Sequence, residues 1–418
     1  MMLSKRNIKI ISFLLLCFVF NKNFSMNVLN FYDTLILPEI REDSRFQIYG
    51  QFQTGFGCSK GFNCAGFPVN VLQIYDCDQN ALKMLEGFDS NCPIGQLRER
   101  IDAADNCIRG HLSVCGDLKM NAALELAWWY HFKENFSLSF HLPIFSMKLC
   151  NVCWQDHTRD ITAEDLRVKE YLTNNLCRVT RELGCLDIGN WCRSGAGDAL
   201  ALFRWMRDFE QAKYILKNVR LNARLGVTLP TGRRRNEDKI FAFPFGNDGA
   251  TGALAGVGID LTLGHNVKTG LDVQLLHVFG NTRCRRIKTH PCQTEFLLLQ
   301  KANVFREFGI TQRFNLYLEA FQRGGISFRA GYQFVRHGDD YLFISSNRFS
   351  DTIANTAKSL CEWTAHSLIF NLGYNFLRTN ADDERRVHPY VALFAKIPFN
   401  GVQVATTKTI GVTLSIDW

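Results

Sequence analysis

Cysteine is the residue type with the most evident chemistry in this 418-residue chain. Cys17 lies in an apolar leader, which leaves fourteen cysteines, at positions 58, 64, 77, 92, 107, 115, 150, 153, 177, 185, 192, 284, 292 and 361. An even number of cysteines in an exported chain predicts disulfide bonds. We expect Cys284 to pair with Cys292, and Cys361 to pair with one of the five cysteines between positions 150 and 192.

Two other groups of residues have spacings that suggest a reactive site. Cys150-x-x-Cys153 can begin a zinc site, but no second Cys-x-x-Cys or paired histidine follows at finger spacing, so we expect no metal and no cofactor. Ser139 and His141 share one strand face, as a barrel lipase would require, but that face points to the lumen. No acidic residue to orient the histidine is evident, so we expect no enzyme activity.

Charged residues form a third group of candidates, because they alternate with apolar residues in the strand-like segments described next. They can line a selective pore, or they can form an internal salt-bridge network that closes a narrow barrel, and the sequence leaves both interpretations open. The residues are Arg204, Arg220, Arg224, Arg329, Glu125, Asp260, Asp272 and Glu319.

These candidates are positioned by an alternation of period two that recurs along the chain. Successive strand side chains point to opposite faces, so each segment has one apolar and one polar face. In the last segment the polar face has Thr413, Ser415 and Asp417, and the apolar face has Ile410, Val412, Leu414, Ile416 and Trp418. In 118–130 we expect Leu118 and Met120 on the apolar face. The alternation predicts twelve strands, at 45–56, 118–130, 136–144, 198–209, 219–229, 253–263, 267–279, 314–322, 326–336, 368–376, 390–399 and 409–418.

The gaps between these strands are alternately long and short. Long outer loops and short periplasmic turns are typical of outer-membrane barrels, and an even number of strands places both ends of the barrel on one side. Because lipid offers no partner to an open sheet edge, the strands are expected to close. The expected fold is therefore all-β, an antiparallel up-and-down transmembrane barrel of twelve strands, with a soluble β-sandwich as the alternative. Its large outer loops are 57–116, 148–197, 230–252, 280–309 and 337–366, with short helices at 79–87 and 163–184.

The N-terminal stretch reads as a secretory signal. Lys5, Arg6 and Lys9 precede the apolar run 10–20, and a more polar stretch follows to Ser25. We expect a signal peptide at 1–25, a periplasmic segment at 26–44 and the barrel at 45–418. Loss of the four basic residues of 1–25 lowers the formal net charge from +8 to +4, so no nucleic-acid partner is expected. No later segment has eighteen consecutive apolar residues, so no membrane-spanning helix is expected.

Two stretches resemble known families. The alternating run that ends at Trp418 resembles the C-terminal assembly signal of bacterial outer-membrane proteins, although a terminal Phe is commoner there. The resemblance implies outer-membrane lipid and the barrel-assembly machinery as partners. Residues 197–200 with 220–232 are similar to barrels associated with phenol degradation, which are related to fatty-acid-transporter-like channels for small, often apolar, molecules. The cysteine-rich loops depart from that pattern, so its substrate is not carried over.

Two functions follow as hypotheses. The first is an outer-membrane channel or transporter for an unidentified small solute, with a charge-lined lumen restricted by disulfide-tied loops. The second is a non-conducting barrel that anchors the loops for surface interaction or envelope structure.

Overall fold

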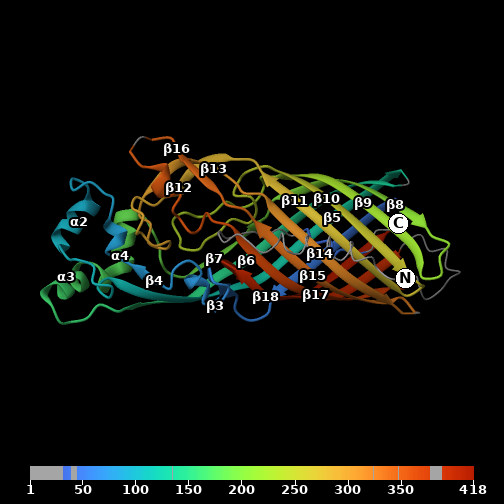
Figure 1. Ribbon diagram of the computed structural model, residues 1–418, viewed down its shortest axis with the longest axis horizontal. Coiled ribbons are helices and arrows are strands. Elements are labelled where there is room, and N and C mark those ends of the chain that lie inside the picture. Colours follow the sequence, from blue (N-terminus) through green and yellow to red (C-terminus); the bar gives the residue numbers. More distant parts are fainter. Residues whose placement is uncertain (1–31, 39–44, 134, 323, 347, 377–387) are drawn as a thin grey trace, which may run out of the picture.

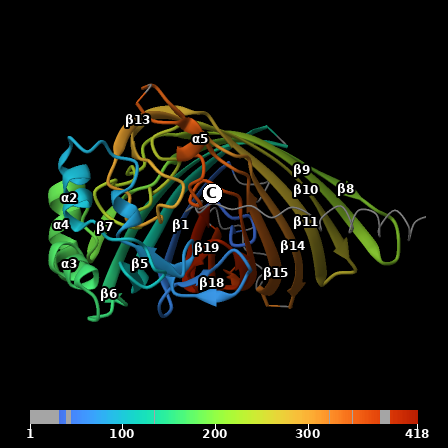
Figure 2. The same cartoon turned by 60° about the vertical axis from the view of Figure 1, so that its left-hand side comes forward.

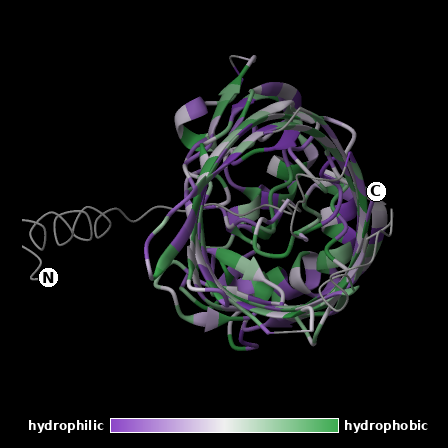
Figure 3. Cartoon of the chain, turned by 90° about the vertical axis from the view of Figure 1, so that its right-hand side faces the viewer, coloured by the Kyte–Doolittle hydropathy of each residue, from purple (hydrophilic) through white to green (hydrophobic). Residues whose placement is uncertain are grey.

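Twelve antiparallel strands close into a barrel (Figure 1) in the computed structural model, which describes residues 32–38, 45–133, 135–322, 324–346, 348–376 and 388–418. Each barrel strand pairs with its neighbours along the chain, and the last pairs with the first, so the sheet forms a ring (Figure 3). The barrel strands are β1 (Phe46–Gly55), β5 (His111–Lys133), β6 (Phe136–Asp156), β8 (Ala199–Glu210), β9 (Leu216–Leu229), β10 (Gly252–Leu263), β11 (Val267–Val278), β14 (Thr311–Phe321), β15 (Ile326–His337), β17 (Trp363–Asn375), β18 (His388–Val402) and β20 (Thr409–Asp417). The predicted twelve-strand barrel is confirmed, and the sandwich alternative is wrong.

The barrel turns its apolar side chains outward, as the alternation predicts. In β20, Ile410, Leu414 and Ile416 are 48%, 55% and 47% exposed, whereas Thr413 and Ser415 are buried on the inner face. The other strands repeat this arrangement, and their exposed large apolar residues include Ile48, Phe52, Leu126, Trp128, Phe140, Phe203, Leu225, Val257, Leu275, Leu316, Phe328, Leu372 and Leu393. The barrel therefore has an apolar exterior and a polar lumen.

Short turns and long loops lie at opposite ends of the barrel. At one end, which we call the turn end, β1 begins beside the end of β20, where the Trp418 amide donates to the Phe46 carbonyl at 3.0 Å. At the other end the long loops build a cap on the barrel, with α2, α3 and α4 at the left of Figure 2. The predicted alternation of long and short connections is thus confirmed for the described residues. The expected signal peptide, 1–25, lies outside them.

The cap is built on β5 and β6, which continue beyond the barrel wall (Figure 1). There they pair with β4 (Asp78–Asn80) and β7 (Trp191–Ala196). The predicted helix at 163–184 is confirmed as α3 (Ala163–Tyr171), the 3₁₀ turn η3 (Thr173–Asn175) and α4 (Leu176–Gly184). The helix predicted at 79–87 is wrong: that stretch holds β4 and the 3₁₀ turn η2 (Lys83–Leu85). The remaining cap elements are β2 (Lys60–Phe62), β3 (Pro68–Val69), η1 (Val71–Gln73), α2 (Pro93–Ile101), β12 (Asn281–Arg286), β13 (Lys301–Glu307), β16 (Tyr341–Ile344), α5 (Asp351–Ala354) and β19 (Val404–Thr406).

One hydrophobic core fills most of the cap. Its buried residues come from the first four long loops and from the extended parts of β5 and β6, and they include Val71, Leu72, Ile94, Val114, Leu149, Val168, Val179, Phe241 and Leu297. None of the helices in the described part of the chain combines the length and the apolar character needed to cross a membrane.

The side-chain pattern of β5 reverses part-way along the strand, which the sequence analysis missed. Leu118 and Met120 were expected on the exterior with Leu126, but they are buried against the cap core at 2% and 7% exposure. The pairing of β5 with β6 skips Asn121, so that Asn121 and Ala122 both lie on the outer side. Such a β-bulge adds one residue to one strand and moves every later side chain to the opposite face.

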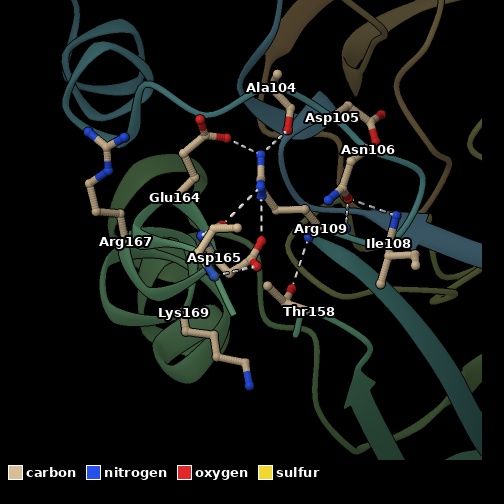
Figure 4. Close-up of polar contacts among 12 residues, drawn as sticks. Ala104, Asp105, Asn106, Ile108, Arg109, Thr158, Glu164, Asp165, Arg167 and Lys169 are labelled. Atoms are coloured by element: carbon tan, nitrogen blue, oxygen red, sulfur yellow. Dashed lines mark hydrogen bonds and ion pairs between the residues drawn. The ribbon is translucent and has the colours of Figure 1, made fainter. Parts of the chain in front are cut away.

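A buried guanidinium joins the first two long loops within the cap (Figure 4). The Nε of Arg109 donates to Asp165 at 2.6 Å, and its Nη1 donates to the Ala104 carbonyl at 2.8 Å and to Glu164. Asp165 also completes the capping box of α3 with Thr162. The hydrogen bond from Arg109 lowers the pKa of Asp165 to about 2. Arg109 therefore holds α3 against the chain that leads into β5.

The cysteines lie in the cap, but the predicted pairings do not form. No disulfide joins any two cysteines in the part of the chain that the structure describes. Cys284 is exposed on β12 and Cys292 is exposed in the loop that follows it. Five of the cysteines lie on strands, because the cap continues the sheet: Cys115, Cys150, Cys153, Cys192 and Cys284 lie on β5, β6, β7 and β12. Nor does any group of three or more possible metal ligands occur among the described residues.

Candidate functional site

A short stretch before β1, residues 32–38, lies inside the barrel, and we call it the lumen segment. Tyr32, Asp33, Leu35, Ile36 and Leu37 are each no more than 5% exposed. The sequence analysis placed this stretch in a periplasmic segment, 26–44. The apolar run at 35–37 was the available signal, because a tail in water gains nothing from three adjacent apolar residues.

Asp33 attaches the lumen segment to the barrel wall. Its Oδ2 accepts from Gln333 of β15 at 2.9 Å and from Lys396 of β18 at 3.1 Å. Its Oδ1 accepts from the Leu35 amide at 3.2 Å, and its carbonyl accepts from the Ile36 amide at 3.1 Å. Asp33 therefore both folds the segment into a turn and binds it to two strands.

The backbone of the lumen segment is also satisfied by lumen side chains. Arg313 donates to the Tyr32 carbonyl, and Arg329 donates to the Leu35 carbonyl at 3.1 Å. Thr34 donates to Asp272 at 3.0 Å. A buried carbonyl without a donor costs free energy, so these contacts favour the segment inside over the segment in water.

Apolar and aromatic side chains also pack against the lumen segment. Leu35 and Ile36 form a buried cluster with Ile369 and Phe394 of the barrel. The ring of Tyr32 meets the ring of His141 edge-on, with 5.0 Å between centroids. The segment is thus packed as a protein core is packed, rather than resting in a water-filled channel.

Most of the predicted lumen charges are paired with each other or with near neighbours. Arg224 bonds Asp272 through both Nη atoms at 2.6 and 2.7 Å, and Arg329 donates to Glu319 at 2.9 Å. Arg220 donates to Asp208 at 2.7 Å, and Asp260 accepts from Tyr317 at 2.6 Å. Six of the predicted lumen residues take part in these contacts: Arg220, Arg224, Arg329, Asp260, Asp272 and Glu319.

Arg204 differs from this group. In the described part of the chain it has no carboxylate within ion-pair distance, and its buried Nε has no acceptor. It lines a small polar cavity below the lumen segment together with Arg220 and Lys268. Among the predicted lumen arginines, Arg204 is therefore the one without a carboxylate partner in the described part of the chain.

Glu125, the remaining predicted charge, lies beside the pair considered for hydrolase chemistry. The Nδ1 of His141 is 2.8 Å from Glu125, and its Nε2 is 3.0 Å from the hydroxyl of Ser139. The expectation that no acidic residue orients His141 is therefore wrong, because the pairing of β5 with β6 brings Glu125 next to it. All three side chains are at most 2% exposed, and Ser139 lies mid-sheet between Trp129 and Leu202. A substrate has no approach to this serine in the present arrangement.

Three cavities follow one another from the cap to the turn end. The first, in the cap, has a volume of about 100 Å³ and shares Thr311 with the second, of about 190 Å³, in the upper lumen. Asp33 and Ile36 line the floor of the second. Thr34 and Leu37 line the third, of about 70 Å³, below. The lumen segment is the partition between the second and third cavities.

No family model and no curated protein matches this sequence. Among solved structures, an outer membrane channel from Pseudomonas putida F1 aligns at 12% identity over 91% of this chain and 97% of that one, with a TM-score of 0.48. The Pseudomonas putida toluene transporter TodX aligns at 7% identity over 90% and 89%, with a TM-score of 0.35. A FadL homologue of Pseudomonas aeruginosa aligns at 8% identity over 90% and 89%, with a TM-score of 0.28.

Proposed function

We propose that this protein is an outer-membrane channel or transporter for small solutes, and that the lumen segment closes it. A closed barrel with an apolar exterior and a polar lumen suits a lipid bilayer, where every backbone group must pair within the protein. The observation that carries the proposal is the partition itself: seven residues separate two lumen cavities that would otherwise be continuous.

The partition is held by contacts that can be exchanged without opening the barrel. Asp33 is bound by side chains of β15 and β18, and no strand pairing runs through the segment in the described part of the chain. Displacement of the segment toward the turn end would leave all twelve strands paired. The restriction on the outer side would come from the packed cap core, and not from the disulfide-tied loops expected from the sequence.

Single-channel recording in planar bilayers tests the proposal. We expect the natural chain to be closed for most of the time, and a variant with residues 32–38 replaced by glycine and serine to show stepwise conductance. Asp33→Asn, which removes the charge that binds Lys396, should open more often than the natural chain. Asp160→Asn, at an exposed position in the cap, should not.

If both the natural chain and the replacement variant are silent, the channel proposal is wrong. The second function, a barrel that anchors the cap, would then stand, and it is favoured by the dense packing of the lumen around the segment.

We further propose that Arg204 gives the open lumen a preference for anions. In the replacement variant, Arg204→Ala should shift the reversal potential in a salt gradient toward that of a non-selective pore. Arg207→Ala removes the same charge from the exterior face of the same strand and serves as the control. An unchanged reversal potential in Arg204→Ala would rule out this role.

A further inference from the structure

The lining of the cap cavity has more basic than acidic residues. Its basic residues are Arg235, Lys239, Arg285, Arg286 and Arg306, and its acidic residues are Glu237, Asp248 and Glu295. Each of these basic side chains has a carboxylate partner, but three of the partners, Asp187, Asp238 and Asp340, lie outside the lining, so the wall of the cavity itself has more cationic than anionic groups. An anion placed there would be favoured by electrostatics, because opposite charges attract more strongly away from water.

Two of these guanidinium groups have hydrogen-bonding capacity to spare. Arg285 donates to Asp248 and to Asn281, and Arg306 donates to Asp340 at 2.5 Å. Each keeps a buried Nε–H that meets no acceptor in the described part of the chain. Buried donors are usually paired in proteins, and although the Nε–H of several other buried arginines also lacks an acceptor, these two belong to residues that line one cavity, where a ligand could supply the acceptor.

The electrostatic environment of Arg285 agrees with this excess of charge. Burial and the nearby charge of Arg306 lower the pKa of Arg285 to about 10, in spite of its contact with Asp248. A cation that is destabilised by its surroundings is stabilised when an anion binds beside it.

The rest of the lining is mainly apolar and includes several aromatic residues. Tyr75, Phe241, Phe296 and Phe308 line the same cavity, and the guanidinium of Arg306 lies 4.8 Å from the ring centre of Phe308. The volume of about 100 Å³ is smaller than that of an engineered apolar cavity of about 150 Å³ that binds benzene, but the cap cavity is partly open, so a small molecule can extend beyond it. An inorganic anion would leave this apolar wall uncovered.

We infer that the cap cavity binds a small organic anion, one carboxylate or similar group on an apolar body, before it reaches the lumen. The charged group would meet Arg285 and Arg306, and the apolar body would lie against Phe296 and Phe308. The inference rests on the proposed channel only for its place on the route, because Thr311 lines both the cap cavity and the upper lumen cavity.

Equilibrium binding to the full chain in detergent micelles tests the inference, with benzoate as the probe. Benzyl alcohol, which has the same ring without the charge, and acetate, which has the charge without the ring, should each bind about tenfold or more weakly than benzoate. Comparable binding of benzyl alcohol would mean an apolar site, and comparable binding of acetate would mean an unspecific anion site; either result overturns the inference.

Asp248 provides a matched pair of variants. Arg283 and Arg285 both donate to it, but only Arg285 lines the cavity. Either single change leaves Asp248 with one guanidinium partner, so the two variants carry a similar cost to folding. We expect Arg285→Gln to weaken benzoate binding by about tenfold or more, and Arg283→Gln to change it little.

Equal weakening in both variants would attribute the effect to the position of Asp248 and overturn the site. Ser359→Phe, which fills the cavity from its lining without removing a charge, should also abolish benzoate binding. Retained binding in this variant would contradict the inference. Because these measurements need no conductance, binding without channel activity would refute the proposed function alone, and channel activity without benzoate binding would refute the site alone.

Discussion

The hairpin of β5 and β6 has two halves whose faces are used in opposite ways. Within the barrel wall, β6 turns Leu138 and Phe140 outward and Ser139 and His141 inward. Beyond the wall the same strand turns polar residues outward and buries Phe145, Met147 and Leu149 in the cap core. One half is therefore built for apolar surroundings and the other for water, although the backbone pairing runs through both.

The two strands reach this reversal by different means. In β6 the apolar residues lie on the outer face up to Ile144 and on the inner face from Phe145 onward. The strand itself stays regular at this point. In β5 the apolar residues keep even numbers from Leu112 to Trp128, and the bulge at Asn121 turns the strand over. The carbonyl of Asn121 accepts a hydrogen bond from Thr54 at 2.9 Å, which ties the bulge to β1. The boundary between the apolar and the aqueous surroundings of the hairpin therefore lies near Asn121 in β5 and Ile144 in β6.

Single-residue deletions should have the largest effect on this arrangement. Deleting Ala127 should prevent assembly. The deletion shifts the alternation by one residue, so the part of β5 on one side of it must turn over and place polar residues such as Glu125 in the apolar exterior. Deleting Asn121 should be tolerated, because Met120 and Ala122 already pair with the consecutive residues Met147 and Ser146. Gel mobility with and without heating, which distinguishes folded barrels, gives the measurement. Equal loss of folded barrel in the two deletions would show that the bulge does not mark the boundary.

Truncation of an inward leucine beyond the wall should cost more than truncation of an outward leucine within it. Leu149→Ala removes a 1% exposed side chain from the cap core and should destabilise the cap by about 2–5 kcal/mol. Leu138→Ala should cost less, because lipid chains can fill the space. Both variants are titrated with urea in lipid vesicles. Protease resistance of the cap reports the effect of Leu149→Ala, and unfolding of the barrel reports the effect of Leu138→Ala. A larger effect of Leu138→Ala would reverse the assignment of the two halves.

A charge on the exterior should be costly in one half and harmless in the other. Phe140→Arg places a cation on the apolar exterior at the middle of the barrel part of β6 and should cost about 2–4 kcal/mol. Gln155→Arg, on the exposed face of the same strand in the cap, should be nearly neutral. Folding free energies in vesicles measure both. Similar values would mean that the barrel exterior does not face lipid.

The smallest expected effect is a dependence of cap stability on acid pH. The pKa of Asp165 is about 2, below its ordinary value of 3.8, so its contribution to stability is complete above the ordinary value and is lost as the pH falls through about 2. Burial raises the pKa of Asp340, but Arg306 and His337 outweigh this effect and lower the pKa to about 2, so Asp340 acts in the same direction. Pepsin cleavage of the cap should therefore rise between pH 4 and pH 2 while the barrel stays intact. In Asp165→Asn this pH dependence should be reduced, and an unchanged profile would exclude the Arg109 pair as its source.

The sequence alone was sufficient for the barrel because alternation is a local property: Ile410, Leu414 and Ile416 must all face one way, whatever the rest of the chain does. It was insufficient where one extra residue changes the phase, as at Asn121, because the even-numbered apolar set continues across the bulge. It was also insufficient for contacts between distant residues. Nothing near Asp33 in the sequence indicates Lys396, and nothing near Arg285 indicates that it lines one cavity with Arg306. The pairing of Glu125 with His141 was missed for the same reason.

The seam between β1 and β20 has a consequence for the order of assembly. Gln47 pairs with Asp417, and Gly55 pairs with Thr409, so the seam joins parts of the chain that are separated by nearly its whole length. Contacts of such long sequence separation form late, because the entropy of closing the intervening chain opposes them. The lumen segment lies shortly before β1 in the chain and must be enclosed when the seam forms. Defects in the seam should therefore appear as slow assembly with an empty or misfilled lumen, even where the finished barrel is as long-lived as that of the natural chain.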